Sequence, residues 1–150
     1  MSDTRRKVVV SACLLGDRCR YDGQGQDHAG VREALHDADV IAVCPEQLGG
    51  LSTPRPPSEF SGGTGDALLN GQARIVGRDD GVDRTDAFLR GAERALAEAG
   101  DATSAILKAR SPSCGHGQTW REGRVVAGHG VFAALLRRAG LTIRTEEDFD

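Results

Sequence analysis

Short apolar runs, separated by stretches in which apolar residues recur every three or four positions, dominate the hydrophobic pattern of the chain. The runs at residues 7–12, 39–43 and 104–109 are continuous rather than alternating, which is typical of strands covered on both faces of a parallel sheet. Residues 141–145 form a fourth candidate strand. We therefore expect a sheet built largely from parallel strands.

Helical patterns lie between and after these runs, at residues 29–38, 85–100 and 130–140. The second is the strongest, because its apolar residues fall on one stripe and Gly100 provides a natural end. That stripe comprises Phe88, Ala92, Ala95, Leu96 and Ala99. Strands and helices alternate, an order that favours right-handed crossovers between parallel strands. We predict a single α/β domain over residues 1–150, an open, mostly parallel, Rossmann-like sheet with helices on both faces.

Residues 45–84 interrupt this alternation and are too long for an ordinary loop, which predicts an inserted hairpin and loop segment. Within them, Asn70-Gly71 separates the two apolar pieces of residues 67–77, a pattern that favours a β-hairpin. The Pro/Gly-rich residues 54–65 are typical of the wall or lid of a site rather than of a linker, because the domain continues beyond them.

Composition narrows the classes of function. The 150 residues carry a net charge of −3 and a pI near 5.8, so no overall positive field attracts nucleic acid or anionic lipid. No apolar run reaches the roughly 20 residues of a membrane span, and the N-terminus lacks the apolar stretch of a signal peptide. Glycine-rich phosphate-binding motifs are also missing. We expect a cytoplasmic protein without a nucleic-acid or membrane partner.

Cysteines supply the strongest chemical signal, since thiols in a reducing compartment are more often metal ligands or reactive groups than disulfides. Cys13 follows the first predicted strand, Cys44 the second and Cys114 the third. Because the carboxyl ends of parallel strands face one edge of the sheet, where ligands bind, we expect these three cysteines to meet. Cys19 lies in a polar, turn-like stretch and is interpreted as an ordinary cysteine, with a fourth ligand as the alternative.

Three clustered thiolates repel one another unless a soft metal lies between them. Zinc with an open position and a 4Fe–4S cubane with one iron free of protein ligands both suit three cysteines. The residues alone leave both open, beside a simpler alternative of three half-buried thiols that pack as small hydrophobes.

Several polar residues flank these cysteines. Glu46 follows Cys44 by two positions and is either a general acid or base or a solvated loop glutamate. Ser111 precedes Cys114 by three positions and offers a hydroxyl, although serine also caps turns. Histidines 116 and 129 lie in Gly-rich turns, and we assign them no role.

Four segments together resemble a bacterial family: SACLLGDRCRYDG, VCPEQLGGLSTPRPPSE, AILKARSPSCG and GVFAALL. In order and spacing they are similar to the DUF523 family, which is associated with thiouracil desulfurases, and the resemblance runs from about residue 7 to residue 145. It implies a 4Fe–4S cluster held by Cys13, Cys44 and Cys114, with Glu46 and Ser111 assisting the reaction.

The activity implied by this resemblance is a non-redox desulfuration. The open iron takes the sulfur of 2-thiouracil or a related thiouridine, the pyrimidine is converted to its oxo form, and sulfide is released. Two rival hypotheses are an iron–sulfur sensor or binding module without catalysis and a zinc hydrolase with three thiolate ligands. The residues do not indicate whether the substrate is a base, a nucleoside or a nucleotide. They also do not indicate an oligomeric state.

Overall fold

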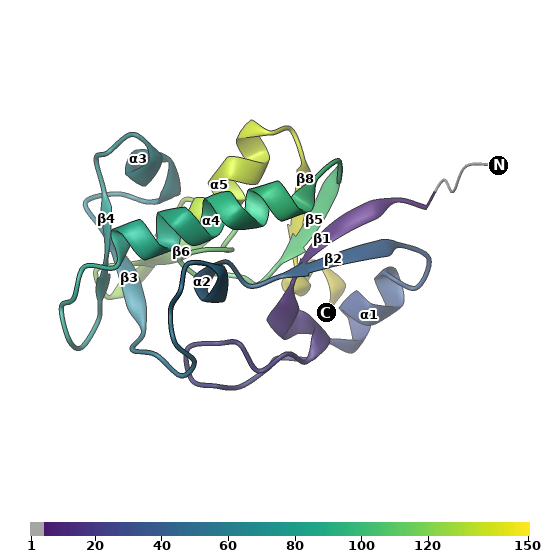
Figure 1. Ribbon diagram of the computed structural model, residues 1–150, viewed down its shortest axis with the longest axis horizontal. Coiled ribbons are helices and arrows are strands. Elements are labelled where there is room, and N and C mark those ends of the chain that lie inside the picture. Colours follow the sequence, from purple (N-terminus) through teal and green to yellow (C-terminus); the bar gives the residue numbers. More distant parts are fainter. Residues whose placement is uncertain (1–4) are drawn as a thin grey trace.

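The computed structural model describes residues 5–150, so residues 1–4 of the predicted domain lie outside the described part. Its main sheet has the order β2-β1-β5-β8, and every neighbouring pair is parallel (Figure 1). The strands are β1 (Lys7–Ser11), β2 (Asp39–Val43), β5 (Ser104–Leu107) and β8 (Thr142–Thr145). The predicted mixed α/β fold with a mostly parallel sheet is therefore confirmed.

Helices cover both faces of this sheet, as predicted. Helices α4 (Thr85–Ala99) and α5 (Val131–Arg138) lie over one face, and α1 (Ala29–Ala34) lies against the other (Figure 1). Strand β1 serves two cores, because its side chains alternate between the faces. Val9 packs with the α4 and α5 side chains, whereas Val8 and Val10 pack in a separate cluster that contains Val31 of α1.

Strand β2 departs from the expectation that each predicted strand is covered on both faces. It lies at the edge of the sheet, and its exposure alternates along the strand, with Val40 39% exposed. The continuous apolar run therefore overestimated the burial of β2. As an edge strand, β2 pairs with another strand on one side alone.

A second sheet, with the order β4-β3-β6-β7, lies at the other end of the molecule and was not predicted (Figure 1). Its strands are β3 (Ser58–Ser61), β4 (Arg74–Gly77), β6 (Gln118–Arg121) and β7 (Arg124–Ala127). Strands β6 and β7 form a hairpin whose two turn residues, Glu122 and Gly123, have positive φ angles of 50° and 87°. Two-residue hairpin turns favour that backbone conformation.

The predicted hairpin at Asn70-Gly71 is wrong. The residues before it form a helix, α3 (Gly65–Leu69), which ends at Asn70, and Gly71 follows with φ of 78°. An antiparallel pair does exist in the insertion, but it joins β3 to β4 across α3. Asn-Gly suits a helix end as well as a hairpin, since both require a left-handed residue.

The remaining elements are α2 (Pro45–Leu48) and two 3₁₀ helices, Ala12–Leu15 and Glu146–Phe149. Within residues 5–150, no helix is both long enough and apolar enough to cross a membrane.

Candidate active site

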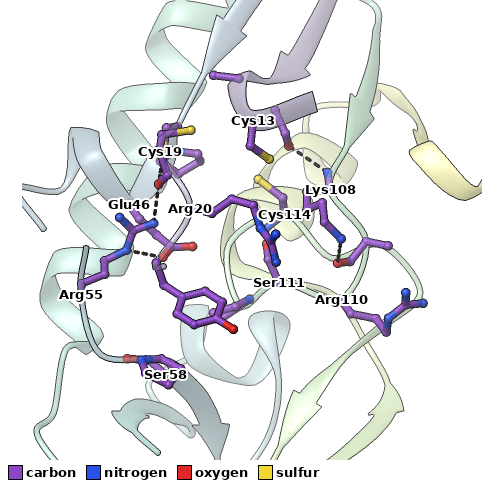
Figure 2. Close-up of a pocket in the computed structure, with 18 of the residues that line it drawn as sticks. Cys13, Cys19, Arg20, Glu46, Arg55, Ser58, Lys108, Arg110, Ser111 and Cys114 are labelled. Atoms are coloured by element: carbon purple, nitrogen blue, oxygen red, sulfur yellow. Dashed lines mark hydrogen bonds and ion pairs between the residues drawn. The ribbon is translucent and has the colours of Figure 1, made fainter. Parts of the chain in front are cut away.

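A pocket of about 290 Å³ opens at the carboxyl ends of β1, β2 and β5. All four cysteines of the chain line it. Figure 2 shows the sulfur atoms of Cys13 and Cys114 turned toward each other, with Glu46 beside Arg55. The topology thus brings together the three cysteines that the sequence places after separate strands.

Cys13 lies in the 3₁₀ turn that follows β1 and is 6% exposed. The carbonyl of Cys13 accepts hydrogen bonds from the backbone N–H of Gly16 at 3.1 Å and of Gln26 at 2.8 Å. Gly16 has φ of 93°, a left-handed conformation that glycine adopts readily. These contacts hold the polar loop after Cys13 close to the pocket.

Cys44 is the N-cap residue of α2, with Pro45 at the first helical position, where a missing N–H costs nothing. This short helix packs against α4 at a very close approach: a Cβ on Gly91 would lie 1.8 Å from the carbonyl oxygen of Pro45. Glycine at that position therefore lets α2, and with it Cys44 and Glu46, sit against the long helix.

Cys114 belongs to a loop that is held by the start of α5. The backbone N–H groups of Phe132 and Ala133 donate to the carbonyl of Ser113 at 2.9 and 3.2 Å. Free N–H groups at a helix start satisfy that carbonyl. Within the loop, the Cys114 N–H donates to Ser111 Oγ at 2.7 Å. The loop geometry thereby sets the direction of the Cys114 side chain.

The surroundings of Cys19, Cys44 and Cys114 raise the pKa values of their thiols. Burial raises the pKa of the Cys114 thiol to about 12. Contact with the Cys19 thiol, followed by burial, raises the pKa of Cys44, and a hydrogen bond with Cys13 raises the pKa of Cys19 to about 11. A metal centre must displace the thiol protons when it binds, because thiolates are the ligands.

Glu46 is not the solvated loop glutamate of the alternative interpretation. It lies in the first turn of α2, and its side chain is 15% exposed. Arg55 Nε donates to its Oε1 at 2.9 Å, and Ser113 Oγ donates to its Oε2 at 3.2 Å. The carboxylate is thus fixed at both oxygens and lines the pocket.

Ser111 and Ser113 have different surroundings. Ser111 lines the pocket, its oxygen accepts a hydrogen bond from the backbone N–H of Cys114, and its hydroxyl also contacts the Cys114 thiol. Ser113 is 1% exposed and is the serine that contacts Glu46. The two histidines stack on each other, with ring centroids 5.0 Å apart, and neither lines the pocket. Burial lowers the pKa of both His116 and His129.

Cys19, interpreted from the sequence as an ordinary cysteine, lines the pocket with the other three. Its side chain is buried, and its carbonyl accepts from Cys44 Sγ at 3.7 Å and from Arg55 Nη2 at 2.8 Å. The first loop also contributes Arg20 and Tyr21 to the lining.

The second sheet and β5 provide the rest of the wall. Trp120 of β6 is 37% exposed, and the Arg78 guanidinium lies 5.2 Å from the centre of its ring. Lys108 follows β5, and its Nζ forms an ion pair with the buried Glu146 at 2.9 Å. Lys108, Arg78 and Trp120 all line the pocket.

The profile of the 2-thiouracil desulfurase family matches residues 8–148. The chain belongs to the 2-thiouracil desulfurase family. The family resemblance of the four sequence segments is therefore confirmed. The protein is an enzyme of the thiouracil desulfurase kind.

Two relatives extend this comparison. The desulfurase is 41% identical over 148 residues to YbbK of Bacillus subtilis (strain 168), an uncharacterized protein, with 95% of this chain and 97% of the relative covered. It is 40% identical to TudS (DUF523Vcz), a 4Fe–4S-dependent thiouracil desulfidase of known structure. The TM-score is 0.78, and the alignment covers 96% of this chain and 93% of that chain.

The thiols that line the pocket are soft donors of the kind that an iron–sulfur cluster takes. Over residues 5–150, no group of three or more His, Cys, Asp or Glu side chains is placed to hold one metal ion. A cubane spreads its cysteines over separate irons, and buried soft thiols around one cavity suit it.

Sequence reasoning missed the residues that organise the site around Glu46. Arg55 stands between prolines in a segment without helical or strand periodicity, so no local pattern indicates its buried position. Trp120 lies in a four-residue strand of mixed polarity. Both side chains reach the pocket through contacts with residues that are distant in the chain.

Proposed function

We propose that this desulfurase converts a thiolated pyrimidine, 2-thiouracil or a related thiouridine, to its oxo form without net electron transfer. The balance is one thiocarbonyl and one water giving one carbonyl and one hydrogen sulfide. The observation that carries the proposal is the single pocket lined by Cys13, Cys44 and Cys114 together with the fixed carboxylate of Glu46. The kind of substrate follows from the family and from the name of the TudS relative.

The thiolates of Cys13, Cys44 and Cys114 would hold the cluster, leaving one iron without a protein ligand. When bound, the cluster supplies a Lewis acid that can take the substrate sulfur and make the adjacent carbon more electrophilic. The soft character of these donors, the burial of Cys13 and Cys114, and their origin at three different strand ends support this ligand set.

The chain's own groups handle protons. Glu46 accepts a proton from the water that attacks the thiocarbonyl carbon, since its Oε2 has a second lone pair beside the one used by Ser113. Ser111 donates its hydroxyl proton to a polar atom of the heterocycle, because its oxygen is already oriented by the Cys114 N–H.

The proposal also concerns partners and location. A pocket of about 290 Å³ is near the lower end of the range for small-molecule sites, which supports a small ligand. We place the reaction in the cytoplasm, because four free thiols persist best in a reducing compartment.

Anaerobic turnover of 2-thiouracil tests the proposal. We expect sulfide release by the reconstituted protein, and none once the cluster has been removed. Glu46→Gln should keep the iron content and the cluster absorbance near ~400 nm but lower kcat by about 10²-fold or more, the typical loss of a general base.

Two results would contradict parts of this proposal. Full activity of Glu46→Gln would remove the assigned base. An intact cluster that releases no sulfide from any thiolated pyrimidine would favour the sensor hypothesis.

A further inference from the structure

Arg55 is a buried arginine at the edge of the pocket. Its side chain is 4% exposed, although arginine is seldom buried unless its charge is paired. Its backbone N–H donates to the carbonyl of Tyr21 at 2.7 Å, which fixes the residue against the loop after Cys13. A charged side chain held at such depth requires partners for its donors.

Each of the three guanidinium nitrogens has a partner, and together they satisfy four of the five N–H donors. Nε donates to Glu46 Oε1 at 2.9 Å, and Nη2 donates to the Cys19 carbonyl at 2.8 Å. On its own segment, Nη1 donates to the carbonyl of Ser52 at 3.1 Å and to Thr53 Oγ1 at 3.0 Å. One side chain therefore connects α2 and the loop after β1 (Figure 2) with the loop at residues 52–55.

The orientation of the Glu46 carboxylate depends on the planar guanidinium of Arg55. Helix α2 spans Pro45–Leu48, a single turn, and so short a helix has little stability of its own. Arg55 holds Oε1 and Ser113 approaches Oε2, so the plane of the carboxylate is set from two sides. Each carboxylate oxygen keeps a further lone pair, and the fixed plane sets the direction in which it can accept another hydrogen bond.

We propose that Arg55 is a positioning residue for desulfuration, which fixes the Glu46 carboxylate by its Nε while its Nη2 holds the Cys19 loop at the pocket wall. This inference rests on the proposed function, in which Glu46 takes the proton of the attacking water. The planar fork is essential, because a lysine ammonium is a point charge that cannot span Glu46 and the Cys19 carbonyl in the same geometry.

The test compares Arg55→Lys, Arg55→Gln and Arg55→Ala with wild type after anaerobic reconstitution, with kcat normalised to iron content. We expect cluster content close to wild type, kcat lowered about 10- to 100-fold, and KM for 2-thiouracil changed by less than about threefold, because a misplaced catalytic group affects turnover more than binding. Methylguanidinium at millimolar concentration should restore part of the kcat of Arg55→Ala, and methylammonium should not.

Arg90→Ala is the matched control. Arg90 Nη2 donates to the carbonyl of Gly49, so it holds the end of α2 from outside the pocket without contacting Glu46. We expect its kcat to remain within about twofold of wild type, since surface substitutions away from a site have small effects. A kcat loss in Arg90→Ala equal to that in Arg55→Ala would reduce Arg55 to a general support of α2 and overturn the proposal.

A double-substitution cycle with Glu46→Gln gives a second readout. Arg55→Gln should add little further loss of kcat in the Glu46→Gln background, and in thermal unfolding of cluster-free protein the two changes should be less than additive. Additive effects in unfolding would overturn the proposal, as would unchanged kcat in Arg55→Lys. The unfolding cycle needs no turnover, so it reports on Arg55 even where wild type releases no sulfide and the proposed function itself fails.

Discussion

The parallel sheet and the second sheet line the same pocket but supply different groups. Strands of the parallel sheet lead into Cys13, Cys44 and Cys114, the thiols proposed to hold the cofactor. The second sheet and the segments next to it supply the polar and aromatic wall: Arg55, Ser58, Arg78 and Trp120. The two central strands of the first sheet, β1 and β5, are largely apolar and buried, whereas every strand of the second sheet has at least one polar end.

This difference predicts that the parallel sheet binds the cofactor and the second sheet binds the substrate. If the comparison is correct, changes at the parallel sheet should abolish the cluster, and changes at the second sheet should leave the cluster in place and alter kinetics. The following predictions test that division, beginning with the largest expected effect.

Substitution of a proposed ligand should have the largest consequence. Cys114→Ser should lose the absorbance near ~400 nm and most of its iron, and activity should fall by more than about 10²-fold, because oxygen is a poor substitute for a soft thiolate. Iron and sulfide analysis after anaerobic reconstitution measures this. Cys19→Ser, in the same pocket, should retain the cluster. Equal loss in both variants would make Cys19 a ligand and remove the three-cysteine assignment.

Gly91→Ala should disturb the parallel-sheet side of the pocket without touching a thiol. The new Cβ would lie 1.8 Å from the Pro45 carbonyl oxygen, so α2 must move away from α4. We expect a loss of about 2 kcal/mol or more in the free energy of unfolding, together with reduced kcat. Urea unfolding of cluster-free protein measures the first effect. Glu93→Ala, an exposed position of α4, is the control; a similar loss there would exclude the packing explanation.

Trp120→Ala addresses the second sheet. The ring lines the pocket beside Arg78, and its loss should raise KM for a pyrimidine about 3- to 10-fold, equivalent to about 0.5–1.5 kcal/mol of aromatic contact. Iron content should not change. Val125 faces Trp120 across the hairpin, so Val125→Ala controls for damage to the strand pair. Loss of the cluster in Trp120→Ala would break the proposed division between the sheets.

The smallest effect concerns the joint between β4 and α4. An ion pair with Arg74 lowers the pKa of Asp83 to about 2, so its stabilisation is complete above the ordinary aspartate pKa near 3.8 and is lost as the pH falls toward 2. Both side chains are substantially exposed, which limits the contribution to less than about 1 kcal/mol. Urea midpoints should differ between wild type and Asp83→Asn at pH 7, and the difference should shrink between pH 4 and pH 3. A difference independent of pH would contradict the ion-pair explanation.

Local sequence patterns predicted the parallel sheet well because its strands and helices carry their own periodicity. The positions of the cysteines after three strands were enough to predict that they share an edge, since the topology of a parallel sheet leaves little choice. The same reasoning failed at Asn70-Gly71, where a dipeptide that suits two kinds of turn follows a helix. It also failed for the β6–β7 hairpin, whose Glu122-Gly123 turn is a weak local signal.

The sequence by itself therefore determined the main sheet, the strand-end placement of three thiols and the family. Only the tertiary structure decided which polar groups reach those thiols. Glu46 becomes a fixed carboxylate because Arg55, nine positions away along the chain, is folded back and buried against it. The proximity of Ser113 to Glu46 spans 67 positions. Such contacts depend on how separate elements pack, and no residue's immediate neighbours in the chain encode them.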